Sequence, residues 1–96
     1  MSLVLVIDDD PAVCLVMQHV LERHGFEVSI AFDGQSGLSR FAELNPDLAI
    51  VDILMPGKEG MATIMEMREA QPDARILAMT GGGTFAANEI FCGSPS

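Results

Sequence analysis

The stretch that decides the fold is Leu48-Ala49-Ile50-Val51-Asp52-Ile53-Leu54-Met55-Pro56. Its consecutive apolar residues, bounded by polar ones, are typical of a strand that is buried on both faces of a sheet. Pro56 has no N–H to donate to a neighbouring strand, so the strand must end before it. Asp52 therefore lies at or just past the C-terminal end of the strand, where open parallel sheets form their ligand crevice.

A second apolar run has the same form and lies near the N-terminus. Leu3-Val4-Leu5-Val6-Ile7 is followed at once by Asp8, Asp9 and Asp10. If the two strands are parallel neighbours, their carboxyl ends bring Asp8, Asp9 and Asp52 together. Asp10 is interpreted as a helix cap, because aspartate is favoured at that position and a proline follows it.

Strand and helix patterns alternate along the chain up to residue 80. The expected strands are 3–8, 26–31, 48–52 and 75–79, and the expected helices are 11–24, 35–44 and 60–71. This alternation predicts an α/β fold with a parallel sheet, helices on both faces and right-handed crossovers. The predicted organisation is one domain over 1–83 and an atypical tail over 84–96, in which 84–91 could form a short helix and no fifth strand is visible.

The first helix shows the clearest periodicity. Its apolar residues recur at the spacing of one helical face, which we expect to pack on the sheet. These residues are Val13, Val16, Met17, Val20 and Leu21.

Composition excludes several classes of function. The net charge is −9 and Lys58 is the single lysine, so no basic patch for nucleic acid is expected. The acidity indicates either a partner with a basic face or simply solubility. No apolar run approaches the ~18 residues of a membrane span, and the N-terminus has no basic flank of a signal peptide, so the expected compartment is the cytoplasm.

The predicted acidic corner has a definite chemistry. Three neighbouring carboxylates repel one another, and a hard cation with oxygen ligands such as Mg²⁺ relieves the repulsion. One oxygen of Asp52 then remains free to attack a phosphoryl group and form an acyl phosphate. Thr80 directly follows the strand at 75–79, where its hydroxyl could hydrogen-bond a phosphoryl oxygen. Taken alone, Asp8 and Asp9 could be a solvated turn and Thr80 a turn residue.

These residues resemble the receiver domain of two-component response regulators. The resemblance rests on Asp8-Asp9 after a strand, Asp52 ending the third strand, Met55-Pro56 and Gly60 after it, and Thr80 ending the fourth. It implies a flavodoxin-like, doubly wound sheet with the order 2-1-3-4-5, and a phosphoryl group donated to Asp52 by a histidine kinase or a phosphotransfer protein. It also implies that Asp8, Asp9 and the Leu54 carbonyl hold Mg²⁺ with Asp52, and that Thr80 is the switch hydroxyl.

The chain also departs from that family. The family ends with a fifth strand that carries a lysine, followed by a fifth helix, but here no lysine follows Lys58. The expected sheet is therefore 2-1-3-4, with the fifth strand and helix missing or replaced by the tail. The exposed side of the fourth strand could be covered by 84–92 or by a second copy, or the chain could be a fragment. Pairing with a second copy, a homodimer through the strand-four side, is the favoured expectation.

Two functions remain open at this point. The first is a phosphoacceptor module of a phosphorelay that catalyses its own phosphorylation on Asp52 and is no stand-alone metabolic enzyme. The alternative is a degenerate, non-phosphorylated protein-interaction domain that keeps the receiver fold. A phosphatase-type hydrolase is disfavoured, because Leu54 stands where such enzymes place a second aspartate.

Overall fold

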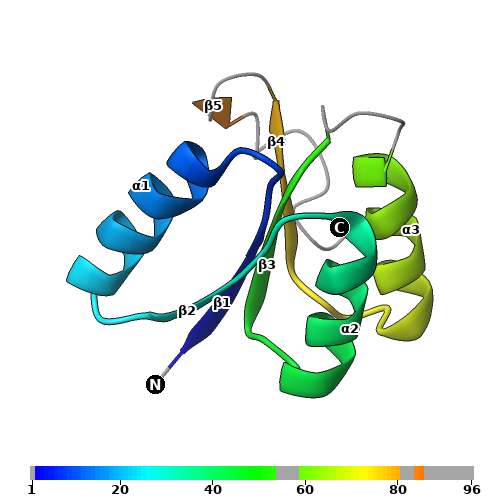
Figure 1. Cartoon of the computed structure of the whole chain (residues 1–96). Coiled ribbons are helices and arrows are strands. Elements are labelled where there is room, and N and C mark those ends of the chain that lie inside the picture. The colour runs from blue at the N-terminus through cyan, green and yellow to red at the C-terminus, as the bar shows by residue number, and fades with distance from the viewer. Residues whose placement is uncertain (1, 54–58, 81–83, 86–96) are drawn as a thin grey trace.

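The structure is a computed structural model, and it describes residues 2–53, 59–80 and 84–85. Strands and helices alternate along most of this range (Figure 1). In chain order the elements are β1 (Leu3–Ile7), α1 (Pro11–Arg23), β2 (Glu27–Ala31), α2 (Gly34–Leu44), β3 (Leu48–Asp52), α3 (Glu59–Ala70), β4 (Ile76–Thr80) and β5 (Thr84–Phe85). The predicted elements are thus confirmed, with boundaries that shift by one or a few residues.

The sheet has the order β2-β1-β3-β4-β5. The first four strands pair in parallel, which confirms the predicted order 2-1-3-4 and the flavodoxin-like fold. The fifth position is held by two residues of the tail, which run antiparallel to β4, with Phe85 paired to Met79 and Thr84 paired to Thr80. The helix expected from Thr84 onward is wrong for these two residues, because their backbones pair with the end of β4; residues 86–91 lie outside the described range.

Helices cover the two faces of the sheet unequally. In Figure 1, α1 lies on one face, and α2 and α3 lie side by side on the other. The larger core packs between the sheet and α2 and α3, and consists of Leu5, Ile7, Ala31, Phe41, Ala49, Val51, Ile64, Met67, Ile76 and Ala78. The smaller core packs under α1, and consists of Val4, Val6, Cys14, Ile50 and Met79. Side chains that alternate along β1 and β3 enter the two cores in turn, as expected for strands buried on both faces.

Helix ends are set by local hydrogen bonds. The Asp10 side chain accepts a hydrogen bond from the Ala12 N–H, and Pro11 opens α1, as the sequence predicts. The Asp33 side chain accepts one from the Ser36 N–H at 2.7 Å and caps α2 in the same way. These caps make α1 and α2 begin directly after β1 and β2, so the loops at that edge of the sheet are short.

The predicted inner face of α1 is too broad. Met17 and Leu21 pack against the smaller core, but Val16 is 61% exposed and Val20 is 47% exposed. In the described ranges α1 has no neighbouring helix on its face of the sheet, so the flank that carries these two valines has nothing to pack on. Leu48 and Leu77, which pack against the smaller core from the sheet, are half-buried.

No helix in the described ranges combines the length and the apolar character that crossing a bilayer requires.

Candidate metal centre

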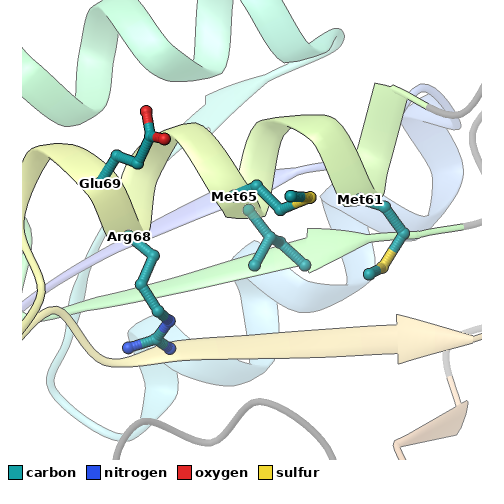
Figure 2. A pocket seen from close by; sticks show the side chains of 5 residues that line it. Met61, Met65, Arg68 and Glu69 are labelled. Carbon is teal, nitrogen blue, oxygen red and sulfur yellow. The ribbon is translucent and has the colours of Figure 1, made fainter.

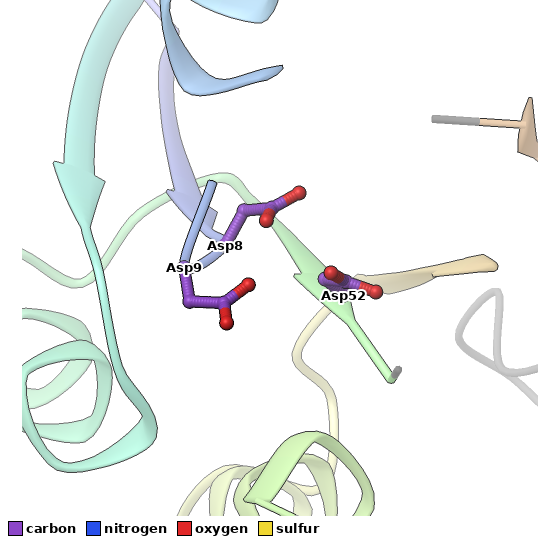
Figure 3. A group of neighbouring side chains, drawn as sticks. All are labelled: Asp8, Asp9 and Asp52. Atoms are coloured by element: carbon purple, nitrogen blue, oxygen red, sulfur yellow. The ribbon is translucent and has the colours of Figure 1, made fainter. Parts of the chain in front are cut away.

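Three carboxylates meet at the carboxyl edge of the sheet. Asp8 directly follows β1, and Asp52 is the last residue of β3. Because Ile7 pairs in register with Val51, the residues that follow them, Asp8 and Asp52, lie side by side. One carboxylate oxygen each from Asp8, Asp9 and Asp52 lies within 4.8 Å of the others, and Figure 3 shows the three side chains converging.

The main chain holds Asp8 tightly. Its side chain and backbone are only 3% exposed, and its N–H donates to the Ala31 carbonyl oxygen at 3.1 Å. Its Oδ1 accepts a hydrogen bond from the Asp10 N–H at 2.9 Å. The backbone N–H of Asp10 thereby fixes the orientation of the Asp8 carboxylate.

Burial makes a charged Asp8 costly. The pKa of Asp8 rises to about 6, mainly because burial disfavours the carboxylate, although the Asp10 N–H opposes the rise. The charge of Asp52 and a hydrogen bond shared with it raise the pKa further, and the charge of Asp9 adds to this. The cluster thus favours an extra positive charge, which either a proton or a cation can supply.

The donor set indicates which cation fits. The three side chains offer only oxygen atoms, one buried, one half-buried and one exposed. Hard divalent cations take such ligands, and Mg²⁺ needs only a few protein oxygens because it keeps several waters. The residues present therefore fit the predicted Mg²⁺, and the exposed side at Asp9 leaves room for waters and a phosphoryl group.

The other two predicted site residues are placed less completely. Thr80 is the last residue of β4, and it follows Met79, which pairs in register with Asp52. Its backbone therefore lies at the same sheet edge as the carboxylates, while its side chain is not among the described groups. Leu54, whose carbonyl was the fourth predicted ligand, lies outside the described residues.

Cys14 supports the site and was missed in the sequence. Its thiol donates a hydrogen bond to the Asp8 carbonyl oxygen at 3.3 Å, and its side chain is buried in the smaller core. Burial and the surrounding aspartates raise the pKa of the thiol to about 11, so it stays protonated and remains a donor. The one available signal was its position in the first turns of the helix that follows Asp8.

Gly60, near the start of α3, packs against the backbone at the end of β3. A Cβ atom at this position would lie 2.4 Å from the Asp52 carbonyl oxygen and 2.4 Å from the Ile53 Cα. These neighbours are backbone atoms, which cannot move aside as a flexible side chain can. Only glycine therefore lets the start of α3 pack against the end of β3, directly behind Asp52.

We expect Gly60→Ala to destabilise the chain by about 1–3 kcal/mol, the usual cost of forcing extra volume into a packed region. The free energy of unfolding, measured with urea, checks this. Ala62→Gly, two residues further along α3 and exposed, is the matched control, and it should cost only about 1 kcal/mol through helix propensity. A Gly60→Ala chain as stable as the wild type would mean that α3 does not approach β3 this closely.

The fold and the site together define a class of protein. Its members have an α/β fold with a largely parallel sheet, and an acidic cluster at the carboxyl edge of that sheet. Residues 4–91 match the family model described as the response regulator receiver domain. The chain belongs to this family, as the resemblance implied.

Curated relatives agree with this assignment. The chain is 31% identical over 77 residues to the transcriptional regulatory protein TrcR of Mycobacterium tuberculosis, covering 80% of the chain and 30% of that protein. It is 35% identical over 77 residues to the transcriptional regulatory protein ZraR of Salmonella typhimurium, covering 80% of the chain and 18% of that protein. The chain thus spans less than a third of the length of either relative.

Solved structures give the same fold. The response regulator TrrA of Thermotoga maritima in complex with Mg(2+)-BeF is 36% identical, with a TM-score of 0.79 over 83% of this chain and 70% of that one. In a complex of the histidine kinase ThkA with TrrA, the match is 34% identical, with a TM-score of 0.80 over 90% of this chain and 74% of that one.

Proposed function

We propose that this chain is the phosphoacceptor module of a two-component phosphorelay, in which Asp52 receives a phosphoryl group in a Mg²⁺-dependent reaction. The observation that carries the proposal is the convergence of Asp8, Asp9 and Asp52 at one sheet edge. A buried carboxylate with a pKa near 6 beside two others is a site that favours a bound cation. Mg²⁺ held by Asp8, Asp9, Asp52 and the Leu54 carbonyl would neutralise the charge on the phosphoryl oxygens.

The chain's own residues have separate roles in this step. An oxygen of Asp52 attacks phosphorus, and the bond between phosphorus and the ring nitrogen of the donor's phosphohistidine breaks. The nitrogen keeps the electron pair and takes a proton from solvent, so that the product is an aspartyl phosphate. Asp8 is held in place by the Asp10 N–H, and the Thr80 hydroxyl donates a hydrogen bond to a phosphoryl oxygen. Most of the catalysis is positioning and charge neutralisation, so the chain itself can catalyse the phosphorylation of Asp52.

The partners follow from the same assignment. TrrA, which shares the fold and is 34% identical, is known in a complex with a histidine kinase, and this supports a histidine kinase or a phosphotransfer protein as the donor. We propose a cytoplasmic location for the reaction, no contact with nucleic acid or membrane by this module, and a receiver domain over 1–83 with a distinct tail over 84–96. A homodimer through the strand-four side also remains a prediction.

One feature of the sequence favours the alternative function. No lysine follows Lys58 within these 96 residues, so this stretch does not itself supply the cation that the family places on its fifth strand. The loss of one charge-assisted hydrogen bond to the phosphoryl group costs about 1.5–3 kcal/mol, which would slow the reaction or shorten the life of the product. A chain that cannot be phosphorylated would be an interaction domain with the receiver fold.

Incubation with acetyl phosphate and Mg²⁺, followed by intact mass spectrometry, distinguishes the two functions. Acetyl phosphate supplies an activated phosphoryl group and leaves as acetate, so no kinase is needed. We expect one phosphoryl group per chain, and none when the metal is removed by a chelator. A chain that stays unmodified at every Mg²⁺ concentration, and also with a phosphorylated histidine kinase, would contradict the phosphoacceptor assignment and favour the interaction domain.

A further inference from the structure

Asp9 contributes the exposed carboxylate of the acidic cluster. The place of this carboxylate depends first on the two peptide groups that flank the Asp9 Cα atom, because their orientations fix the direction in which the side chain leaves the backbone. One of these peptide groups joins Asp8 to Asp9, and the other joins Asp9 to Asp10. A hydrogen bond holds each of them.

The two hydrogen bonds have different origins. The peptide group after Asp9 is held from within the loop, where the Asp10 N–H donates to Asp8 Oδ1 at 2.9 Å and closes a tight turn. The peptide group before Asp9 is held from α1, because the Cys14 thiol donates to the Asp8 carbonyl oxygen at 3.3 Å. Asp9 therefore lies between two fixed peptide groups, one of which depends on the side chain of Cys14.

The direction of side chains in α1 explains how the thiol reaches this carbonyl. Cys14 lies in the first turn of the helix, where its own N–H donates to the Asp10 carbonyl oxygen at 3.1 Å. Side chains of an α-helix lean toward its N-terminus, so a side chain in the first turn points back over the loop before the helix. The thiol thus meets a carbonyl that lies six residues earlier in the chain.

Water does not readily replace this hydrogen bond. Cys14 is 1% exposed and Asp8 is 3% exposed, so both partners are shielded from solvent. A buried carbonyl group that loses its donor is left with the cost of an unmade hydrogen bond, which favours a rearranged loop. A rotation of the peptide group between Asp8 and Asp9 moves the Asp9 carboxylate away from its present place beside Asp52.

We propose that Cys14 is a positioning residue of the metal centre, whose thiol fixes the peptide group between Asp8 and Asp9 and so holds the Asp9 carboxylate within the cluster. The inference rests on the proposed Mg²⁺ site and deepens it. Contacts that orient metal ligands in this way typically change metal affinity by about 10- to 100-fold. A thiol is a weak donor, so we expect an effect at the low end of that range.

Calorimetric titration of the full chain with MgCl₂ tests the proposal through two variants of nearly equal volume. Cys14→Ala removes the donor, whereas Cys14→Ser keeps a donor in its hydroxyl group. We expect the dissociation constant for Mg²⁺ to rise about tenfold in Cys14→Ala and to stay within about threefold of the wild-type value in Cys14→Ser. Both variants leave similar extra space in the smaller core, so the difference between them measures the hydrogen bond.

Val4→Ala is the matched control for lost packing. Val4 is 1% exposed and belongs to the same smaller core as Cys14, but it lies near the start of β1, at the end away from Asp8. This variant should lower the free energy of unfolding more than Cys14→Ala does, because it removes more buried apolar volume. Its Mg²⁺ dissociation constant should nevertheless stay within about twofold of the wild-type value, since distant sites act independently.

Met65→Ala is the control for a substitution on the opposite face of the sheet. Met65 is 64% exposed and lines a groove of about 290 Å³ along α3, together with Met61, Ile64, Arg68 and Glu69 (Figure 2). The free energy of unfolding and the Mg²⁺ dissociation constant should both remain close to the wild-type values, as is usual for surface substitutions.

A second measurement needs no metal. The NMR order parameter of the Asp9 amide in the metal-free chain should fall in Cys14→Ala, and should keep the wild-type value in Cys14→Ser and Val4→Ala. Equal Mg²⁺ dissociation constants in Cys14→Ala and Cys14→Ser overturn the proposal, and so does an unchanged order parameter in Cys14→Ala. A wild-type chain that binds Mg²⁺ without being phosphorylated contradicts the proposed function alone, whereas one that binds no Mg²⁺ contradicts both.

Discussion

Asp52→Asn should abolish phosphoryl incorporation from acetyl phosphate, while the wild type gains one phosphoryl group per chain. The amide of asparagine has almost the shape of the carboxylate, but it lacks the charged oxygen that attacks phosphorus. The loss should exceed about 100-fold in rate, as is usual when a nucleophile is removed. Intact mass spectrometry at saturating Mg²⁺ measures the modified fraction directly.

Asp10→Asn is the matched control for this variant. Asp10 adjoins the acidic cluster but caps α1 instead of joining the cluster, and asparagine caps helices equally well. This variant should be phosphorylated like the wild type. If Asp52→Asn were still modified to the extent of the wild type, then Asp52 would not be the phosphoacceptor.

Asp8→Asn should stabilise the metal-free chain and at the same time remove its response to Mg²⁺. The pKa of Asp8 rises from 3.8 to about 6 on folding, so between these values the folded chain binds more protons than the unfolded chain. The free energy of unfolding therefore falls as the pH rises through this window, and the full penalty is present above pH ~6. Because the cluster opens to solvent at Asp9, we expect a penalty of about 1–2 kcal/mol.

Urea unfolding at several pH values, with and without Mg²⁺, measures this effect. In Asp8→Asn the free energy of unfolding should lack this fall between pH ~4 and pH ~6, and should exceed the wild-type value at neutral pH without metal. Mg²⁺ should stabilise the wild type, because it binds only the folded state, and should leave the variant unchanged. Asp33→Asn, which changes an exposed capping carboxylate on α2, is the control for a general charge effect. Parallel pH curves for wild type and Asp8→Asn would show that burial of Asp8 does not penalise its charge.

The convergence of the acidic residues could be predicted on one condition, that the two strands which end at them are parallel neighbours. Parallel neighbours end at the same edge of a sheet, and the pairing of Ile7 with Val51 confirms that condition. The caps at Asp10 and Asp33 are equally local, since a side chain bonds to a backbone N–H two or three residues away. The caps need no knowledge of the rest of the fold.

The features that sequence patterns missed depend on the three-dimensional arrangement of the helices, strands and loops. The periodicity of α1 marks Val16 and Val20 as apolar, but only the arrangement of the helices shows that nothing covers them in the described part of the chain. The contact of the Cys14 thiol with the Asp8 carbonyl depends on the path of the loop between them. The pairing of Thr84 and Phe85 with β4 depends on the chain turning back, which no local pattern indicated.

The order of apolar runs, caps and carboxylates along the chain was enough to specify the parallel sheet and the residues of the acidic edge, because short-range hydrogen bonds and strand periodicity act within each segment. Tertiary packing alone decided how deeply Asp8 is buried, hence its raised pKa, and which face of α1 remains open. Burial is a property of the neighbours that surround a side chain, and those neighbours come from segments far away in the sequence.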